Sequence, residues 1–248
     1  MRQFTQLIGK QAFSRLGVAS FPAMVLVVAV CLAGGVPNAR ADGALPPVDD
    51  LVKAFEIIAF GSETRALAAR TTLLRWDTGE IAVNMTQFMS EGERELKPVP
   101  AQDFWAKFAW NHLRTLENLT GLTFVDSITA KKRPRLTIVF TPRDLLVKVP
   151  IPGVNAKLQR ELAAPGGCYF LSFAGGRMGA LDRAFVVVNM DRDGFLIDHC
   201  LLEELTQSLG LPNDTDVLRP SIFSDHDTLR KLSPTDEILV RTLYHKRM

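Results

Sequence analysis

The sequence predicts a single domain of the α+β class. Short apolar runs of strand length occur along the chain together with segments whose apolar residues have helical spacing. Among its 248 residues, 47% are hydrophobic and 23% are charged. We find no internal repeat, low-complexity tract or second domain in it. The chain is long enough for one domain with a full core.

The first half is predicted to contain a helix, two strands, a charged loop and a long helix. In order, these are Leu51–Ile58, Leu73–Trp76, Ile81–Met85, Ser90–Pro100 and Phe104–Leu119. An Asp-Thr-Gly turn joins the two strands, and a Thr-Gly pair ends the long helix. The aromatic residues of the long helix have the spacing of one helical face, which favours a place in the core.

Three further strands and a broken helix are predicted in the second half. The strands are Arg135–Phe140, Cys168–Phe173 and Ala184–Asn189. The segment Arg143–Ala164 reads as a helix broken around its prolines. The last strand leads through a short polar turn into another helix, whose first turn is expected to hold Cys200.

Residues 1–41 have the composition of a secretory signal peptide. Basic residues precede an apolar run, Val18–Leu32, and the small residues Ala39 and Ala41 mark a cleavage site before Asp42. The expected organisation is a signal peptide at 1–41, a flexible lead at 42–49 and one domain at 50–248. The mature protein would then be periplasmic or secreted, with no stable membrane span.

Charge does not favour nucleic-acid binding. Four of the 29 basic residues and none of the 27 acidic ones lie in residues 1–41, so removing this segment changes the formal net charge from +2 to −2. The remaining basic runs are short, and a nucleic-acid surface needs a clustered basic patch.

Cysteine usage predicts a disulfide. Cys31 lies in the signal peptide, which leaves Cys168 and Cys200 in the mature chain. An even number of cysteines in an exported protein indicates a bridge. No C-x-x-C spacing supports a redox-active pair. A bridge would tie the helix that follows the last strand to the sheet.

The run from Glu203 to Asp214 holds the candidate site. Residues four apart lie on one face of a helix, and in the pattern H-E-x-x-H-x-x-G-x-x-H/D this lets histidines hold a zinc ion while the glutamate activates water. Here Glu203 and Gln207 stand at the first two ligand positions, and Asn213, with Asp214 beside it, at the third. Glu204 keeps the position of the general base.

Two interpretations of this run remain open. Amides are poor zinc ligands, whereas an oxygen-only set of Glu203, Gln207 and Asp214 suits calcium or magnesium better. The alternative is a solvated helix face, because leucines occupy the opposite side of the helix. His199 is expected in a surface or helix-end role. His226 is considered as a metal ligand and ranked below a surface role.

Several segments resemble the zincin metallopeptidases. Besides the helix and Gly210, the segment Arg219–Asp225 resembles the Met-turn of metzincins, with Phe223 in place of methionine. Leu232–Tyr244 resembles the C-terminal helix of the matrixin-like branch. The chain is also similar to an uncharacterised family of secreted bacterial domains in which the run from Glu203 and the Ser-Ile-Phe segment recur.

The resemblance implies a zincin-like fold: a mixed twisted sheet packed on a long helix and the motif helix, with a C-terminal helix. It implies a degenerate cleft that binds a peptide or envelope-protein segment by strand addition, without catalysis and without a cofactor. The alternative is an active hydrolase, either a metal-dependent peptidase or a cell-wall hydrolase, with Glu204 as general base and an atypical divalent-metal site. The third hypothesis is a purely structural domain, in which the polar face of the helix is only solvated.

Overall fold

The computed structural model describes residues 45–61, 71–77, 79–91 and 94–246. The chain divides into two units, Met1–Asp42 and Gly43–Met248, and all described residues belong to the second. The predicted signal peptide therefore lies outside the described residues. The first described helix, α1 (Val48–Phe60), begins within the segment expected to be a flexible lead.

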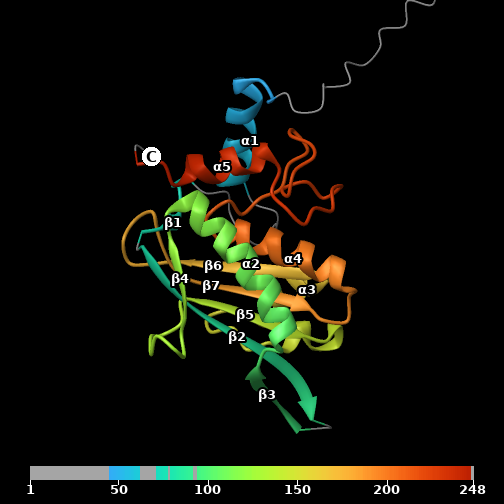
Figure 1. Cartoon of the computed structure of the whole chain (residues 1–248). Helices are drawn as coiled ribbons and strands as arrows, with labels where there is room; N and C mark the ends of the chain where they lie inside the picture. Colours follow the sequence, from blue (N-terminus) through green and yellow to red (C-terminus); the bar gives the residue numbers. More distant parts are fainter. Residues whose placement is uncertain (1–44, 62–70, 78, 92–93, 247–248) are drawn as a thin grey trace, which may run out of the picture. The chain divides into compact units, whose positions relative to one another are not determined.

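Seven strands form one mixed sheet in the described part of the chain (Figure 1). Their order is β1-β7-β5-β2-β3, with β4 also paired to β2 and β6 to β7. The parallel pairs are β1 with β7, β7 with β5, β5 with β2, and β2 with β4. The antiparallel pairs are β3 with β2 and β6 with β7. The bounds are β1 Arg75–Trp76, β2 Glu80–Glu91, β3 Arg94–Pro100, β4 Thr123–Asp126, β5 Leu136–Thr141, β6 Cys168–Ala174 and β7 Ala180–Asn189.

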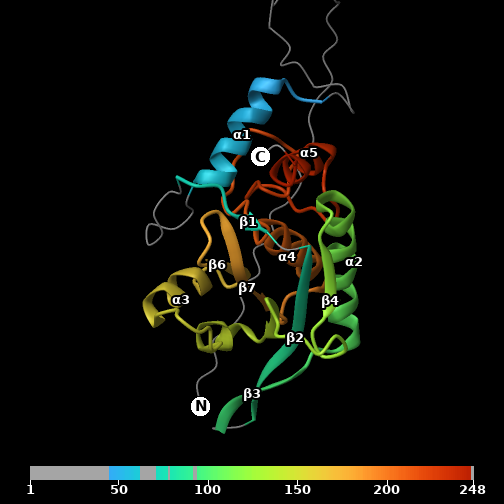
Figure 2. The same ribbon diagram turned by 90° about the vertical axis from the view of Figure 1, so that its left-hand side faces the viewer.

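Helices cover both faces of the sheet. The long helix α2 (Asp103–Thr120) and α4 (Gly194–Gln207) pack on the face that holds the larger core. The short 3-10 helix η1 (Arg143–Lys148) and α3 (Ala156–Ala163) cover the other face (Figure 2). Adjacent residues of β7 point to opposite faces, so Val186 lies in the larger core and Val187 in the smaller. These features confirm the α+β class and the mixed sheet.

The C-terminal helix is also confirmed, as α5 (Pro234–Leu243). Its N-terminus is a capping box: Ser233 accepts a hydrogen bond from the Asp236 backbone N–H at 3.1 Å, and the Asp236 carboxylate accepts one from the Ser233 N–H at 2.8 Å. The helix packs on α1 and α2. No helix among the described residues is long and apolar enough to cross a membrane.

Two local predictions were wrong. The segment 90–100 is not a loop, because β2 continues to Glu91 and β3 returns antiparallel to it. Among the described strands β3 pairs only with β2, and an edge strand tolerates the prolines and charges that favoured a loop. Cys200 does not lie in a first turn, because α4 begins at Gly194, where the Asp193 side chain caps it by accepting from the Leu196 N–H at 3.0 Å.

The aromatic face of α2 was predicted to be core, and this is correct for Trp105 and Phe108, which pack partly buried against the larger core, but not for Phe104. Leu113 and Leu116 are fully buried, whereas Phe104 is 55% exposed. Phe104 packs edge-on against Trp105 and Phe108 at the start of the helix. Phe104 is the second residue of the helix, and helical spacing alone could not show that burial begins only after it.

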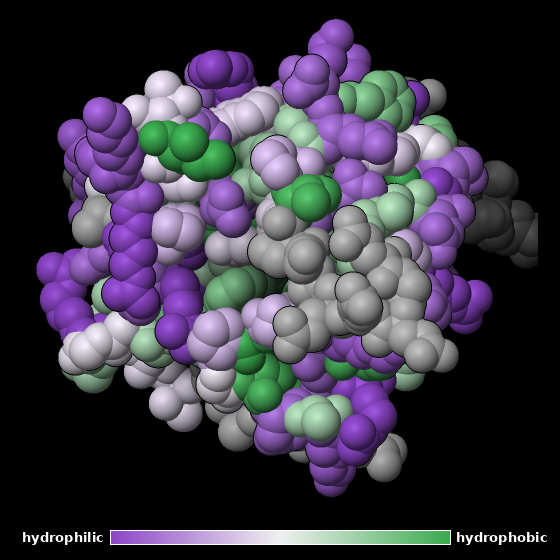
Figure 3. Space-filling model, turned by 90° about the horizontal axis from the view of Figure 1, so that it is seen from below, coloured by the Kyte–Doolittle hydropathy of each residue, from purple (hydrophilic) through white to green (hydrophobic). Residues whose placement is uncertain are grey.

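Elsewhere, exposed hydrophobic side chains are dispersed. On the face of the molecule seen in Figure 3, hydrophobic residues are scattered among hydrophilic ones in the described part of the chain. A broad apolar surface would indicate a docking face, and none is visible on the described residues in that view.

Candidate functional site

The predicted disulfide is confirmed, and it joins β6 to α4. Cys168 is bonded to Cys200, with the two Cα atoms 6.0 Å apart. Further along both elements, the Ser172 hydroxyl donates a hydrogen bond to the Ser208 carbonyl at 3.4 Å. Four strand residues span roughly 13 Å and eight helical residues roughly 12 Å, so β6 and α4 run side by side in the same direction.

One edge of β6 is not paired with another strand. Among the described residues β6 pairs only with β7. The Asn189 N–H donates to the Gly167 carbonyl at 3.0 Å, so the polar groups of Gly167 point toward β7. Because these groups alternate along an antiparallel strand, the backbone N–H and C=O of Cys168, Phe170 and Ser172 point the other way. They form an open edge.

A cavity of about 630 Å³ follows this edge, and we call it the β6–α4 groove. One side is apolar and comes from α3 and the loop before it, with Val154, Leu158 and Leu162. The other side is acidic, with Glu203, Glu204 and Gln207 from α4 and with Asp214 and Asp225 from the segment after α4. The floor consists of Gly167 to Phe173.

The motif positions on α4 are withdrawn from bulk solvent. Glu204 is 6% exposed and Gln207 is 3% exposed, while Glu203 is intermediate. The Gln207 amide donates a hydrogen bond to the Asp214 carboxylate at 2.7 Å. A freely solvated helix face would not show this burial, so the polar side of α4 is a lining of the groove.

Asn213 is directed away from these residues. Its side-chain amide donates to the Ile57 carbonyl at 3.3 Å, and its backbone N–H donates to the Ile58 carbonyl at 3.2 Å. A Cβ atom at Gly61 would come within 2.2 Å of the Asn213 amide nitrogen. Asn213 thus ties the end of α1 to the segment after α4 and is not among the residues that line the groove.

Gly210 occupies a position that only glycine fits. Its φ of +123° lies in a region that side-chain-bearing residues avoid, and an added Cβ would lie 1.9 Å from the Leu74 carbonyl oxygen. The segment after α4 can therefore pass closely over the chain before β1 and bring Asp214 back beside Gln207.

The carboxyl group of Glu203 is strongly perturbed. Burial is the largest cause, and together with the neighbouring carboxylates of Asp214 and Asp225 it raises the pKa of Glu203 from 4.5 to about 8, against the opposing charge of Arg192. A carboxyl group surrounded by like charges holds its proton near neutral pH. Sequence analysis identified Asp214 but missed Asp225 and Arg192, because they follow and precede α4 without any motif spacing.

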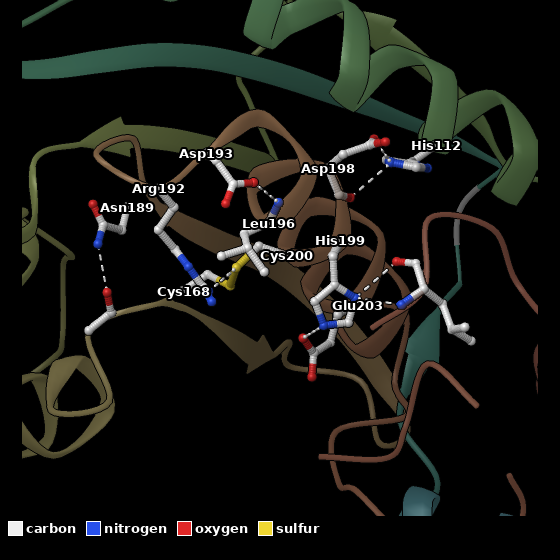
Figure 4. The surroundings of a disulfide bond; sticks show 12 residues. His112, Cys168, Asn189, Arg192, Asp193, Leu196, Asp198, His199, Cys200 and Glu203 are labelled. Carbon is white, nitrogen blue, oxygen red and sulfur yellow. Dashed lines mark hydrogen bonds and ion pairs between the residues drawn. A yellow bond between two sulfur atoms is a disulfide. The ribbon is translucent and has the colours of Figure 1, made fainter. Parts of the chain in front are cut away.

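His199 faces Glu203 one helical turn earlier (Figure 4). Its Nε2 lies 3.4 Å from a Glu203 oxygen, and its Nδ1 contacts the Leu229 carbonyl oxygen at 2.9 Å. Burial lowers the pKa of His199, which favours the neutral ring. The expected surface role is wrong, and the four-residue spacing to Glu203 was the signal that could have revealed this contact.

The chemistry of the donor groups does not fit zinc. Ligand atoms of Cys168, Glu203 and Glu204 lie within 4.8 Å of one another, but the Cys168 sulfur is in the disulfide and cannot act as a thiolate. The remaining donors of the groove are carboxylate and amide oxygens, which match a hard cation such as calcium better. His226 is exposed and pairs with Asp216 at 3.3 Å, away from these groups.

The Met-turn-like segment packs against the core and α5. Phe223 is completely buried in the larger core. The Asp236 carboxylate accepts hydrogen bonds from the Ser221 hydroxyl at 2.6 Å and the Ile222 N–H at 3.1 Å. Burial raises the pKa of Asp236, and these hydrogen bonds oppose the rise. Asp225, the last residue of this segment, lines the groove.

A family described as protein of unknown function (DUF2927) matches residues 48–248. The chain belongs to this family. The match covers every described helix and strand, including both walls of the groove. No curated protein matches the chain. The family description assigns no activity, so the function has to be argued from the groove itself.

Proposed function

We propose that this protein is an exported envelope protein that binds an extended peptide or protein segment in the β6–α4 groove. The observation that carries the proposal is the open edge of β6, which faces α3 and α4 across a cavity of about 630 Å³. An extended chain can hydrogen-bond to such an edge as an additional strand, while pockets on both sides select its side chains.

The disulfide supports an exported protein. Such bridges persist in oxidising compartments such as the periplasm and the extracellular space. The signal-peptide composition of residues 1–41 agrees with this location. Periplasmic or secreted placement therefore forms part of the proposal.

We further propose that the groove descends from a zincin cleft that has lost its metal. An antiparallel edge strand faces the motif helix, Gly210 follows that helix, and a buried turn with Phe223 precedes the C-terminal helix. At two of the three ligand positions the side chains have other partners: Gln207 binds Asp214, and Asn213 binds α1. A binding function needs none of the lost ligands.

Hydrogen exchange tests strand addition residue by residue. A saturating extended peptide selected on the purified protein should slow exchange of the outward-facing amides of Phe170 and Ser172. The amides of Tyr169 and Leu171, which face β7, serve as internal controls. Strand addition is contradicted if every peptide that binds leaves the Phe170 and Ser172 amides unprotected, or if no extended peptide binds.

The second candidate is a hydrolase. Its supporting observation is the raised pKa of Glu203 next to Glu204, since a proton-holding carboxyl beside another carboxyl can divide acid and base roles. The two side chains leave α4 about 100° apart, so a further group would have to complete such a site.

Glu204→Gln separates the two functions. If the groove only binds, the variant should retain peptide affinity within about twofold, because the amide keeps the shape and a hydrogen-bonding oxygen of the Glu204 side chain. Peptide affinity is measured by calorimetry and hydrolysis by mass spectrometry of peptide and peptidoglycan digests. Wild-type hydrolysis that disappears in Glu204→Gln would establish the enzyme instead.

A further inference from the structure

We propose that the groove binds the C-terminal end of its ligand, with the terminal carboxylate held by the guanidinium groups of Arg143 and Arg192 at the start of β6. The bound segment would then run antiparallel to β6. This inference rests on the proposed binding function and adds which end of the ligand is recognised and in which direction the ligand lies.

A second cavity continues the groove at the beginning of β6. It has a volume of about 610 Å³ and shares Gly167, Arg192 and Glu203 with the groove. The segments that line it are the start of η1, the turn before β6, the end of β7 with the residues after it, α4 and the segment 224–227. An extended chain on the β6 edge would therefore reach this cavity with one of its two ends.

Two arginine side chains of this cavity lie against the turn before β6. A Cβ atom added to Gly166 would come within 2.8 Å of the Arg143 Nε, and one added to Gly167 within 2.7 Å of the Arg192 Nη1. Consecutive Cα atoms are about 3.8 Å apart, so both guanidinium groups lie at the same end of β6. Figure 4 shows Arg192 beside the disulfide at that end of the strand. A ligand that ends at this turn ends beside both arginines.

Both guanidinium groups have donors that no carboxylate of the described chain binds. The Arg143 backbone N–H donates to the Asp191 carboxylate at 2.9 Å, but its exposed side chain forms no hydrogen bond or ion pair with the described residues. The Arg192 Nη1 donates to the Cys200 sulfur at 3.2 Å. Sulfur is a weak acceptor, and each guanidinium carries five N–H donors. Most of these donors can therefore bind a carboxylate, for which their planar geometry is suited.

The acidic groups of the second cavity leave these donors available. The Asp227 carboxylate pairs with Arg219 at 2.8 Å. Glu203 retains its proton near neutral pH, because burial together with neighbouring carboxylates raises its pKa to about 8. Asp225 forms no ion pair with either arginine within the described part of the chain. Because Asp191 and Asp225 carry as many formal charges as the two arginines, recognition depends on directed N–H donors and not on an excess of charge.

The strand edge determines the direction of the ligand. The backbone N–H of Cys168 is the first outward-facing donor of β6, directly after the two glycines that the arginines contact. In antiparallel pairing the last ligand residue would lie opposite Cys168, and its carboxylate would accept from this N–H and from the guanidinium groups. A parallel ligand would bring its amino terminus here, which offers them no acceptor. The terminal carboxylate therefore selects the antiparallel direction.

Ligand side chains would alternate between the two walls of the groove. Cys168 and Phe170 point toward α4, as the disulfide and their packing in the larger core require. Tyr169 and Leu171 belong to the smaller core, on the side of α3. Side chains opposite one another in a sheet share a face. A peptide that alternates threonine and valine, with its last threonine opposite Cys168, would thus place its valines on the apolar wall.

Three matched peptides test the terminal carboxylate. Acetyl-Thr-Val-Thr-Val-Thr with a free carboxylate is compared by calorimetry with the same peptide ending in an amide. The acid should bind at least about tenfold more tightly, the ratio expected from one charge-assisted hydrogen bond. The third peptide is the amide with glutamate in place of the last threonine, which moves the carboxylate to a side chain. It should bind within about threefold of the amide, because its carboxylate is not in line with the strand.

Protein variants locate the effect. Arg143→Gln and Arg192→Gln should each reduce the ratio of acid to amide affinity to about threefold or less. Arg143 is exposed, so its replacement should leave the circular dichroism spectrum unchanged. The control is Arg241→Gln on α5, where Arg241 pairs with Glu237 at 3.8 Å. It makes the same change in net charge outside both cavities and should leave the ratio intact.

A nitroxide on the N-terminus of the acid peptide tests the direction. In the antiparallel complex it lies near Ser172 and should broaden the backbone amide signals of residues 172–174 more than those of residues 166–168 in nuclear magnetic resonance spectra. Four strand residues span roughly 13 Å, so the two ends of the edge are distinguishable. The same peptide with its nitroxide reduced is the control, and the reverse pattern overturns the antiparallel placement.

The outcomes separate this inference from the function beneath it. Equal affinity for acid and amide, with protection of the Phe170 and Ser172 amides by both, overturns the carboxylate site and leaves strand addition standing. A preference for the acid that persists in the double variant Arg143→Gln/Arg192→Gln also overturns it, as does a glutamate peptide that binds as tightly as the acid. Failure of any extended peptide to bind, as acid or as amide, removes the proposed function itself.

Discussion

Individual side chains in the groove take their chemistry from burial. Glu203 occurs in the sequence as one of 27 acidic residues, yet its pKa lies at about 8. Burial is the main cause, and the charges of Asp214 and Asp225 add to it. Neither cause is visible in the sequence, because both depend on how the segment after α4 returns across the helix.

This shift predicts a pH dependence of stability. Between about pH 4.5 and 8 the folded state retains a proton on Glu203 that the unfolded state has released. Rising pH therefore favours the unfolded state, and this contribution to the free energy of unfolding falls through that window. Glu203→Gln should remove the fall and be more stable than wild type at pH 8.5, by about 1–3 kcal/mol.

Urea denaturation at pH 5, 7 and 8.5 measures the effect. Burial lowers the pKa of His199, which reduces stability as pH falls below its ordinary value near 6.5, the opposite direction. Both proteins contain His199, so the difference between them isolates Glu203. A Glu203→Gln curve parallel to that of wild type would show that Glu203 does not hold a proton in the folded protein.

At the scale of secondary-structure elements, the groove depends on how β6 and α4 are joined. The larger core holds them together along their length, and the bridge Cys168–Cys200 links them covalently. A second tie runs between α2 and α4, where His112 contacts Asp198 at 2.7 Å and Arg230 pairs with the same carboxylate. These ties hold the acidic side of the groove at a set position beside the strand edge.

Removing the bridge should lower stability without changing the fold. Its two cysteines are 32 residues apart, which corresponds to about 3–4 kcal/mol of loop-closure entropy in the unfolded chain. The double variant Cys168→Ser/Cys200→Ser should show this loss in urea denaturation and the same far-ultraviolet circular dichroism as wild type. Wild type treated with reductant is the control and should match the variant; an unchanged denaturation midpoint would contradict the prediction.

Much of the element order could be predicted from the sequence. Continuous apolar runs predicted β5, β6 and β7, and helical spacing predicted α1 and α2, because burial imposes a period on each element. The resemblance of Leu232–Tyr244 to the matrixin-like branch predicted α5. The 90–100 segment could not be predicted, since strand pairing there overrides composition. The motif spacing brought attention to Glu203, Glu204, Gln207 and Asp214, which line one groove.

The remaining site residues come from tertiary structure. Asp225 and Arg192 reach the groove through the folding of segments on either side of α4, and Asn213 leaves it because α1 offers backbone carbonyls. The open edge of β6 is a property of the whole sheet, since it depends on which strands lie next to β7. No single segment of sequence contains that information.

The buried Asp236 gives the molecule an order of assembly. Its carboxylate anchors Ser221 and Ile222, which lie a few residues before Asp225, and it belongs to α5, the last of the described helices. If the chain is exported as we propose, with its N-terminus first, β6 and α4 leave the membrane before α5. Asp225 would then take its place in the groove only after α5 has followed, so a ligand on the side of synthesis would meet an incomplete groove.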